Sequence, residues 1–168
     1  MIDFRQAEIL IVDGLIEYLA SRGYDCPVIM ANQTSPIPPY PYISYTVITP
    51  VKSNMAGYCI AEDGTRYKEL VQTWSFTAQS DDDVVANQIA MEAYDYFALA
   101  GNTYLSDNDI VAQEVGSITN RDNLLTNEYE YRRGFDVDFT MIHTLSEAVC
   151  TTAGFIETVE LHHEVEVK

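Results

Sequence analysis

The residues best equipped for chemistry are a glutamate and the three histidines of the chain: His143, His162, His163 and Glu164. Imidazole and carboxylate groups bind zinc or transfer protons, which would suit a small metal-dependent hydrolase. Adjacent residues of a regular strand point to opposite faces, however, so His162 and His163 cannot share one metal ion. His162 and Glu164 together supply only two ligands. An exposed strand edge explains this cluster better than a metal site does.

Two further patterns allow both a chemical and a structural interpretation. Cys26, Cys59 and Cys150 are too widely spaced for a C-x-x-C pair, and isolated cysteines are usually small buried hydrophobic residues of reduced proteins. The acidic run 81–83 could hold a cation, but Ser and Asp also accept the free N–H groups at a helix start. We expect a helix cap here, and neither a metal nor a cofactor.

Composition excludes several classes of function. The sequence lacks the glycine-rich phosphate and dinucleotide motifs, the G-x-S-x-G motif and the H-E-x-x-H motif. With 26 acidic and 9 basic residues, the net charge of −17 repels nucleic-acid backbones and anionic membranes. Acidic residues interrupt the apolar runs near the N-terminus, which argues against a secretion signal. The 12 tyrosines suit strands or surfaces buried against other proteins.

Hydrophobic spacing predicts two helices. The first covers about residues 2–21, and its apolar stripe is Phe4, Ala7, Ile11, Leu15 and Leu19. Val12 and Ile16 widen this stripe, so we expect both the protein's own sheet and a neighbouring molecule to cover it. The second helix opens at residues 80–83 and runs to about Ala100, before Gly101.

Alternating residues predict strands at 42–49, 69–79, 110–117, 128–143 and 156–167. Prolines between 36 and 41 form a stiff leader into the first of these strands. Residues 50–66 are small and polar and include the turn sequence Glu62-Asp63-Gly64, which indicates a long exposed hairpin or loop. The prediction is a single α+β domain spanning 1–168, a mostly antiparallel sheet with two helices packed on one face.

One stretch is distinctive, residues 120–137, which read NRDNLLTNEYEYRRGFDV. It resembles the R-D…E-Y/W-E-x-R-x-G-F-D-V stretch of the phage neck terminator family, tail-terminator-like proteins of the head–tail junction. The order of the predicted elements agrees along nearly the whole chain, apart from region 50–66. The glycine after two arginines also suggests a bend or bulge in the strand.

The resemblance implies a structural virion protein without enzymatic activity, made in the cytoplasm of the host bacterium. It implies a ring of identical subunits, a hexamer, between the head connector and the tail tube. Genomic DNA would pass through the acidic lumen without sequence-specific binding. The alternatives are another head–tail adaptor, a tube-like protein, or a hydrolase that uses carboxylates with His143 or His162.

The same stretch supplies the candidate subunit interface. Opposite charges lie close together there and can form forked arginine–carboxylate pairs, within one subunit or across to the next. The alternative is a solvated strand with weak surface pairs. The candidate interface residues are Arg121, Asp122, Glu128, Tyr129, Arg132 and Arg133.

Overall fold

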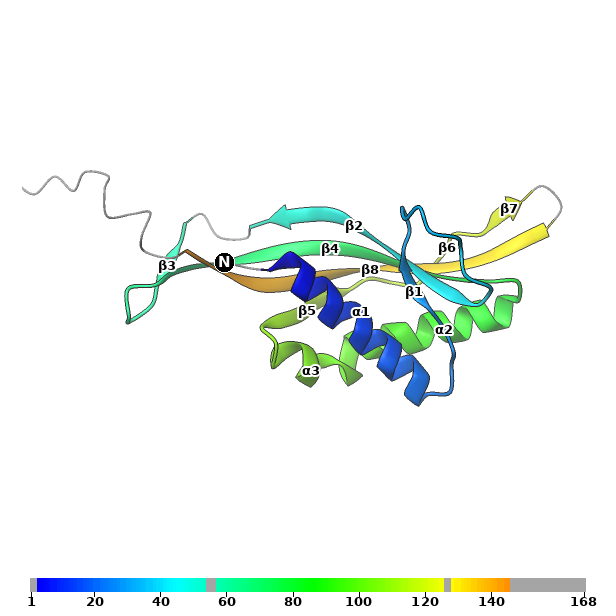
Figure 1. The fold of residues 1–168 in the computed structure, drawn as a ribbon, viewed down its shortest axis with the longest axis horizontal. Helices are drawn as coiled ribbons and strands as arrows, with labels where there is room; N and C mark the ends of the chain where they lie inside the picture. Colours follow the sequence, from blue (N-terminus) through cyan, green and yellow to red (C-terminus); the bar gives the residue numbers. More distant parts are fainter. Residues whose placement is uncertain (1–2, 54–56, 126–127, 146–168) are drawn as a thin grey trace, which may run out of the picture.

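The computed structural model describes residues 3–53, 57–125 and 128–145. Within these ranges an eight-stranded sheet lies against a layer of helices that covers one of its faces (Figure 1). The elements are α1 (Phe4–Ser21), β1 (Val28–Met30), β2 (Tyr42–Lys52), β3 (Cys59–Ile60), β4 (Arg66–Ser80), α2 (Asp83–Asp95), the π-helical turn η1 (Tyr96–Ala100), α3 (Asn102–Ser106), β5 (Ile110–Val115), β6 (Thr119–Asn120), β7 (Asn123–Leu125) and β8 (Glu128–Leu145). The predicted α+β class is confirmed, with a short third helix that the spacing did not predict.

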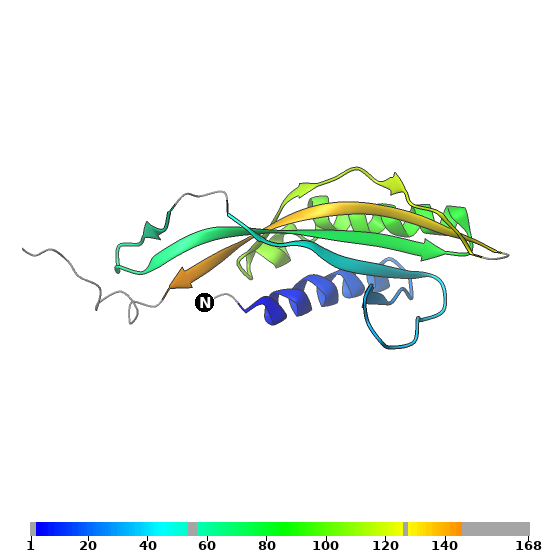
Figure 2. The ribbon, with the colours of Figure 1, turned by 90° about the horizontal axis from the view of Figure 1, so that it is seen from above.

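The sheet has the strand order β1-β2-β4-β8-β5, with β3 beside β4, and β6 and β7 beside β8. Only β1 pairs in parallel, with β2; every other pair among these strands is antiparallel. The β4–β8 ladder runs from the pair Arg66–Leu145 to the pair Ser80–Tyr131 without a shift in register. Seen from above, these two strands form the long axis of the molecule (Figure 2).

The core lies between the sheet and the helices. Phe76, Phe135 and Phe139 point from the strands, and the ring of Phe97 in η1 packs 4.7 Å from that of Phe76, centroid to centroid. Fully burying each such side chain stabilises the fold by about 1.5–3 kcal/mol. The predicted stripe of α1 is buried at Ala7, Ile11, Leu15 and Leu19, whereas Phe4 is 43 % exposed.

Both long helices begin at an aspartate, as the free N–H groups of a helix start require. Asp3 accepts hydrogen bonds from the N–H groups of Arg5 and Gln6. Asp82 accepts them from Val84 and Val85, at 2.8 and 3.1 Å. The prediction that the acidic run caps a helix is therefore confirmed.

The face of the sheet away from the helices carries carboxylate and hydroxyl groups. On β8, Asp136 and Asp138 alternate with the buried Phe135, Val137 and Phe139, as predicted. Lys52 on β2 forms an ion pair of 2.8 Å with Asp138, and Thr73 on β4 donates a hydrogen bond of 2.6 Å to the same carboxylate. Asp138 is thus matched with a cation and a hydroxyl group of the neighbouring strands.

The other predicted elements differ from the structure mainly in extent. Within 50–66, β2 continues to Lys52, and β3 and β4 form a hairpin in which Gly64 donates a backbone hydrogen bond to Ala61. The fourth predicted strand continues to Leu145, because β4 stays paired with it to its own first residue. The predicted strand 156–167, with His162, His163 and Glu164, lies outside the described residues.

Candidate subunit interface and its arginine network

Arg121 lies across β8 and reaches β4. Its guanidinium donates hydrogen bonds to the hydroxyl oxygens of Ser75 (2.6 Å) and Thr77 (3.2 Å), and it pairs with Asp136 at 3.0 Å. This path passes directly over Gly134, where a Cβ atom would lie 2.6 Å from Nη1 of Arg121. Gly134 is therefore needed for close approach. The predicted bulge at this glycine is wrong with respect to β4, because Gly134 pairs with Thr77 in unbroken register.

Arg133 points to the helix side of the sheet and joins three segments. It forms ion pairs with Asp83 in the first turn of α2 and with Asp122 between β6 and β7. It also donates a hydrogen bond of 3.1 Å to the side chain of Asn87. The Arg133 side chain is only 11 % exposed. The partly buried Arg133 side chain therefore holds helix α2 against strand β8.

Asp122 is fixed from several sides. Its carboxylate accepts hydrogen bonds from the backbone N–H of Arg132 (2.8 Å) and the side-chain amide of Asn120 (2.9 Å), besides its ion pair with Arg133. Burial alone would raise the pKa of Asp122, but these partners outweigh it and leave the pKa below its usual value. The carboxylate is thus held in its charged form.

Arg132 points to the open face and neutralises a buried carboxylate. Its partner, Glu130, is 3 % exposed and also accepts a hydrogen bond of 2.7 Å from the Tyr40 hydroxyl. Burial, followed by the adjacent Glu130, raises the pKa of Tyr40 well above its usual value. This contact ties the proline-rich leader to β8.

Tyr129 differs from the other predicted interface residues. Its side chain is 58 % exposed, and its ring stacks on that of Tyr131 with centroids 6.1 Å apart. The structure thus brings Arg121, Asp122, Arg132 and Arg133 into pairs within one subunit and leaves Tyr129 facing outward. Glu128 begins β8, and the structure does not describe its side chain. The use of these residues between subunits remains a prediction.

The partners of the arginines could not be found from the motif alone. Ser75, Thr77 and Asp83 become neighbours of the motif only through the β4–β8 register and the return of α2 along the sheet. Tyr40 reaches Glu130 from 90 positions away in the sequence. The only sequence signal for any of them was the acidic helix start.

Among the residues considered for catalysis, the structure describes His143, Cys26 and Cys59. His143 lies on β8 opposite Lys68 of β4. Cys26 is buried, as predicted, and burial raises the pKa of its thiol to about 12, whereas Cys59 is half-buried. Across residues 3–53, 57–125 and 128–145, no group of three or more His, Cys, Asp or Glu side chains is placed to hold a metal ion. In the same ranges, none of the helices is both long and apolar enough to span a membrane.

A comparison with protein-family models matches residues 10–166 to the phage neck terminator protein family. The chain belongs to this family. The match includes the whole of the 120–137 stretch and nearly all of the described fold. The neck terminator family consists of structural proteins of the phage virion, which interact with other head and tail proteins. No curated protein matches the sequence.

Proposed function

We propose that the chain is the subunit of a hexameric ring that terminates the tail tube and joins it to the head connector. The observation that carries this proposal is the family match over residues 10–166. In this proposal the protein is not an enzyme. It is made in the host cytoplasm and functions in the virion, where DNA passes through the ring.

The surfaces that a ring needs are available on the subunit. A ring forms when each copy presents two different surfaces that meet head to tail and the rotation closes. On α1, the apolar side chains of Ile9 and Ile16 are 44 % and 36 % exposed. On β5, the edge strand at the opposite end of the sheet from β1, Val111 is 50 % exposed. Unpaired backbone groups of an edge strand can also pair with a neighbour.

The charge supports a passage for DNA. Phosphate groups are repelled by a surface with a net charge of −17 per subunit, so the genome would slide without adhering. Four of the described cations pair with carboxylates of the subunit, which leaves them poorly placed to bind phosphates: Lys52, Arg121, Arg132 and Arg133.

The proposal is tested with phage particles that lack this chain. Electron microscopy should then show tails of uncontrolled length, or tails separate from heads, and supplying the chain in trans should restore joined particles. Native mass spectrometry of the purified chain should show a closed oligomer of one order. Normal joined particles without the chain would overturn the proposed role. Imaging of the intact particle would distinguish a terminator from another adaptor by its position.

A further inference from the structure

The outer side of helix α2 carries a line of apolar side chains that the described part of the chain does not cover. Val84, Met91 and Leu99 are 62 %, 50 % and 78 % exposed. Val84 and Met91 are seven residues apart, close to two turns of an α-helix, so both lie on the same side of α2. The opposite side of the helix is buried at Ile89 and Ala93.

The π-helical turn η1 keeps Leu99 in this line. Leu99 follows Met91 by eight residues, which in a regular α-helix would turn it roughly 80° away from Met91. In η1, however, the backbone N–H of Gly101 donates a hydrogen bond of 2.7 Å to the carbonyl of Tyr96, five residues back. A π-helical turn therefore takes up one additional residue, which brings Leu99 back to the side of Met91. Single π-helical turns of this kind are frequent at functional sites.

The segment that carries the apolar line is acidic throughout. Residues 81–109 contain no Lys, Arg or His and seven acidic residues: Asp81, Asp82, Asp83, Glu92, Asp95, Asp107 and Asp109. Cations of other elements pair with two of these carboxylates, Arg133 with Asp83 and Arg22 with Glu92. Asp95 is exposed, lies between Met91 and Leu99 on the helix, and forms no ion pair with any residue that the structure describes.

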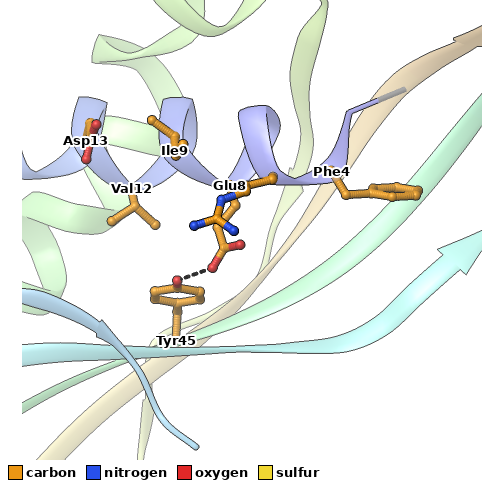
Figure 3. Close-up of a pocket in the computed structure, with 7 residues that line it drawn as sticks. Phe4, Glu8, Ile9, Val12, Asp13 and Tyr45 are labelled. Carbon is orange, nitrogen blue, oxygen red and sulfur yellow. Dashed lines mark hydrogen bonds between the residues drawn. The ribbon is translucent and has the colours of Figure 1, made fainter. Parts of the chain in front are cut away.

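The groove between α1 and β2 differs from this face in charge. Arg5 lies there together with the carboxylates of Glu8 and Asp13. Figure 3 shows Tyr45 pointing from β2 to α1, where its hydroxyl donates a hydrogen bond to Glu8. Charge of both signs is thus present in the α1–β2 groove, whereas the exposed side of α2 combines apolar side chains with negative charge alone.

This combination determines which molecule can cover the face. DNA carries the same sign of charge and is repelled. A second copy fits poorly, because it also carries a net charge of −17 and its Lys52, Arg121 and Arg132 are already paired with its own carboxylates. Covering Asp95 without a cation would be costly, because the carboxylate would lose its water. The occupant must therefore bring both apolar and cationic side chains.

We propose that the face of α2 formed by Val84, Met91 and Leu99 docks a basic amphipathic helix of another virion protein. Apolar side chains of that helix meet the three exposed residues at the same two-turn spacing, and a Lys or Arg pairs with Asp95. This inference rests on the proposed function, because that position between head and tail brings the chain against other virion proteins.

The direct test places a photo-crosslinking phenylalanine analogue at position 99 in assembled phage particles. Mass spectrometry of the linked peptide should identify a segment of another virion protein with apolar residues at helical spacing and Lys or Arg beside them. Links to a second copy, to DNA or to a segment without basic residues would overturn the inference, as would the absence of any link.

A charge-swap test uses phage that lack the chain and receive a variant in trans. Asp95→Lys should reduce the number of joined particles at least about ten-fold, the scale of a central interface contact. Changing the linked Lys or Arg of the partner to Glu should restore joining. Glu62→Lys makes the same charge change at an exposed residue between β3 and β4, and it should have no effect.

Native mass spectrometry distinguishes this contact from contacts within the ring. The Asp95→Lys variant should form the same oligomer as the wild type, and a changed oligomer would assign the face to contacts between copies instead. Undiminished joining by Asp95→Lys, or a loss that the partner's reversal does not restore, would refute the docking alone. Normal joined particles without the chain would instead refute the proposed function.

Discussion

The guanidinium of Arg121 occupies the space that a side chain at position 134 would need. A Cβ atom there would lie 2.6 Å from Nη1 and 2.7 Å from Cζ of Arg121. The central strand β8 thus carries a glycine so that an arginine from the preceding loop can cross it and reach Ser75 on the far side.

Gly134→Ala should displace Arg121 and destabilise the protein by about 1–3 kcal/mol, the range for overpacking and for lost hydrogen bonds to a charged group. Urea unfolding measures this loss. Gly57→Ala is the matched control, since a Cβ atom at Gly57 meets nothing within 4 Å. The loss in a variant that combines Gly134→Ala with Arg121→Ala should be smaller than the sum of the single losses. Strict additivity would show that the two residues are not coupled.

Asp122 should make stability depend on pH. Its pKa is lower in the folded chain than the value of about 3.9 in an unfolded chain. Its contribution to the free energy of unfolding is therefore complete at a pH well above that value. The contribution is lost as the pH falls through the folded pKa. Asp122→Asn should therefore be less stable than the wild type at neutral pH, and the difference should narrow below about pH 4. A constant difference down to strongly acidic pH would contradict this assignment.

Removing the cation from Glu130 should be costly, because this carboxylate is 3 % exposed. Arg132→Met should destabilise the fold by roughly 3 kcal/mol, the lower end for a broken buried pair, since Arg132 itself is 33 % exposed. Adding Glu130→Gln to Arg132→Met should recover part of the loss. Thermal unfolding of the two variants provides the comparison, and no recovery would mean that the charge is not the cause.

The acidic run should behave as a cap. Asp82→Ala should cost about 1 kcal/mol, whereas Asp82→Asn should cost little, because asparagine caps equally well. Adding Mg²⁺ or Zn²⁺ should leave the melting temperature of the wild type unchanged, since a ligand of the folded state would raise it. A metal-dependent increase that Asp82→Ala abolishes would indicate a cation site instead.

Self-association should strengthen with salt, because each subunit carries a net charge of −17. The screening length falls from roughly 30 Å at about 0.01 M salt to roughly 8 Å at about 0.15 M, which weakens repulsion between copies. Sedimentation velocity at these two concentrations tests this effect. Weaker association at the higher salt concentration would mean that ion pairs between subunits dominate the interaction.

The elements that depend on local pattern were predictable from the sequence. The α1 stripe, the cap at Asp82 and the alternation of Phe135 with Asp136 each follow from spacing along one segment. The function of Gly134 was not predictable, because it depends on which side chain lies above it. A bulge was the local interpretation of that glycine, whereas the fold uses it for contact with Arg121.

The candidate interface was predictable in composition but not in arrangement. The motif indicated arginine–carboxylate pairing, but Asp83 and Tyr40 enter the network through tertiary structure alone. The α3 helix was missed because it is only 5 residues long and carries little periodicity.

The unbroken β4–β8 ladder makes the subunit long and resistant to bending along these two strands. Fifteen paired residues at about 3.4 Å each span roughly 50 Å, and a slip of one residue would turn every core side chain of these strands to the wrong face. The β3–β4 hairpin and the β7–β8 hairpin, at opposite ends of the ladder, are thereby kept at a fixed separation. Molecules bound at opposite ends would be held apart by a constant spacing, and a load applied at one end would be transmitted along the strands to the other.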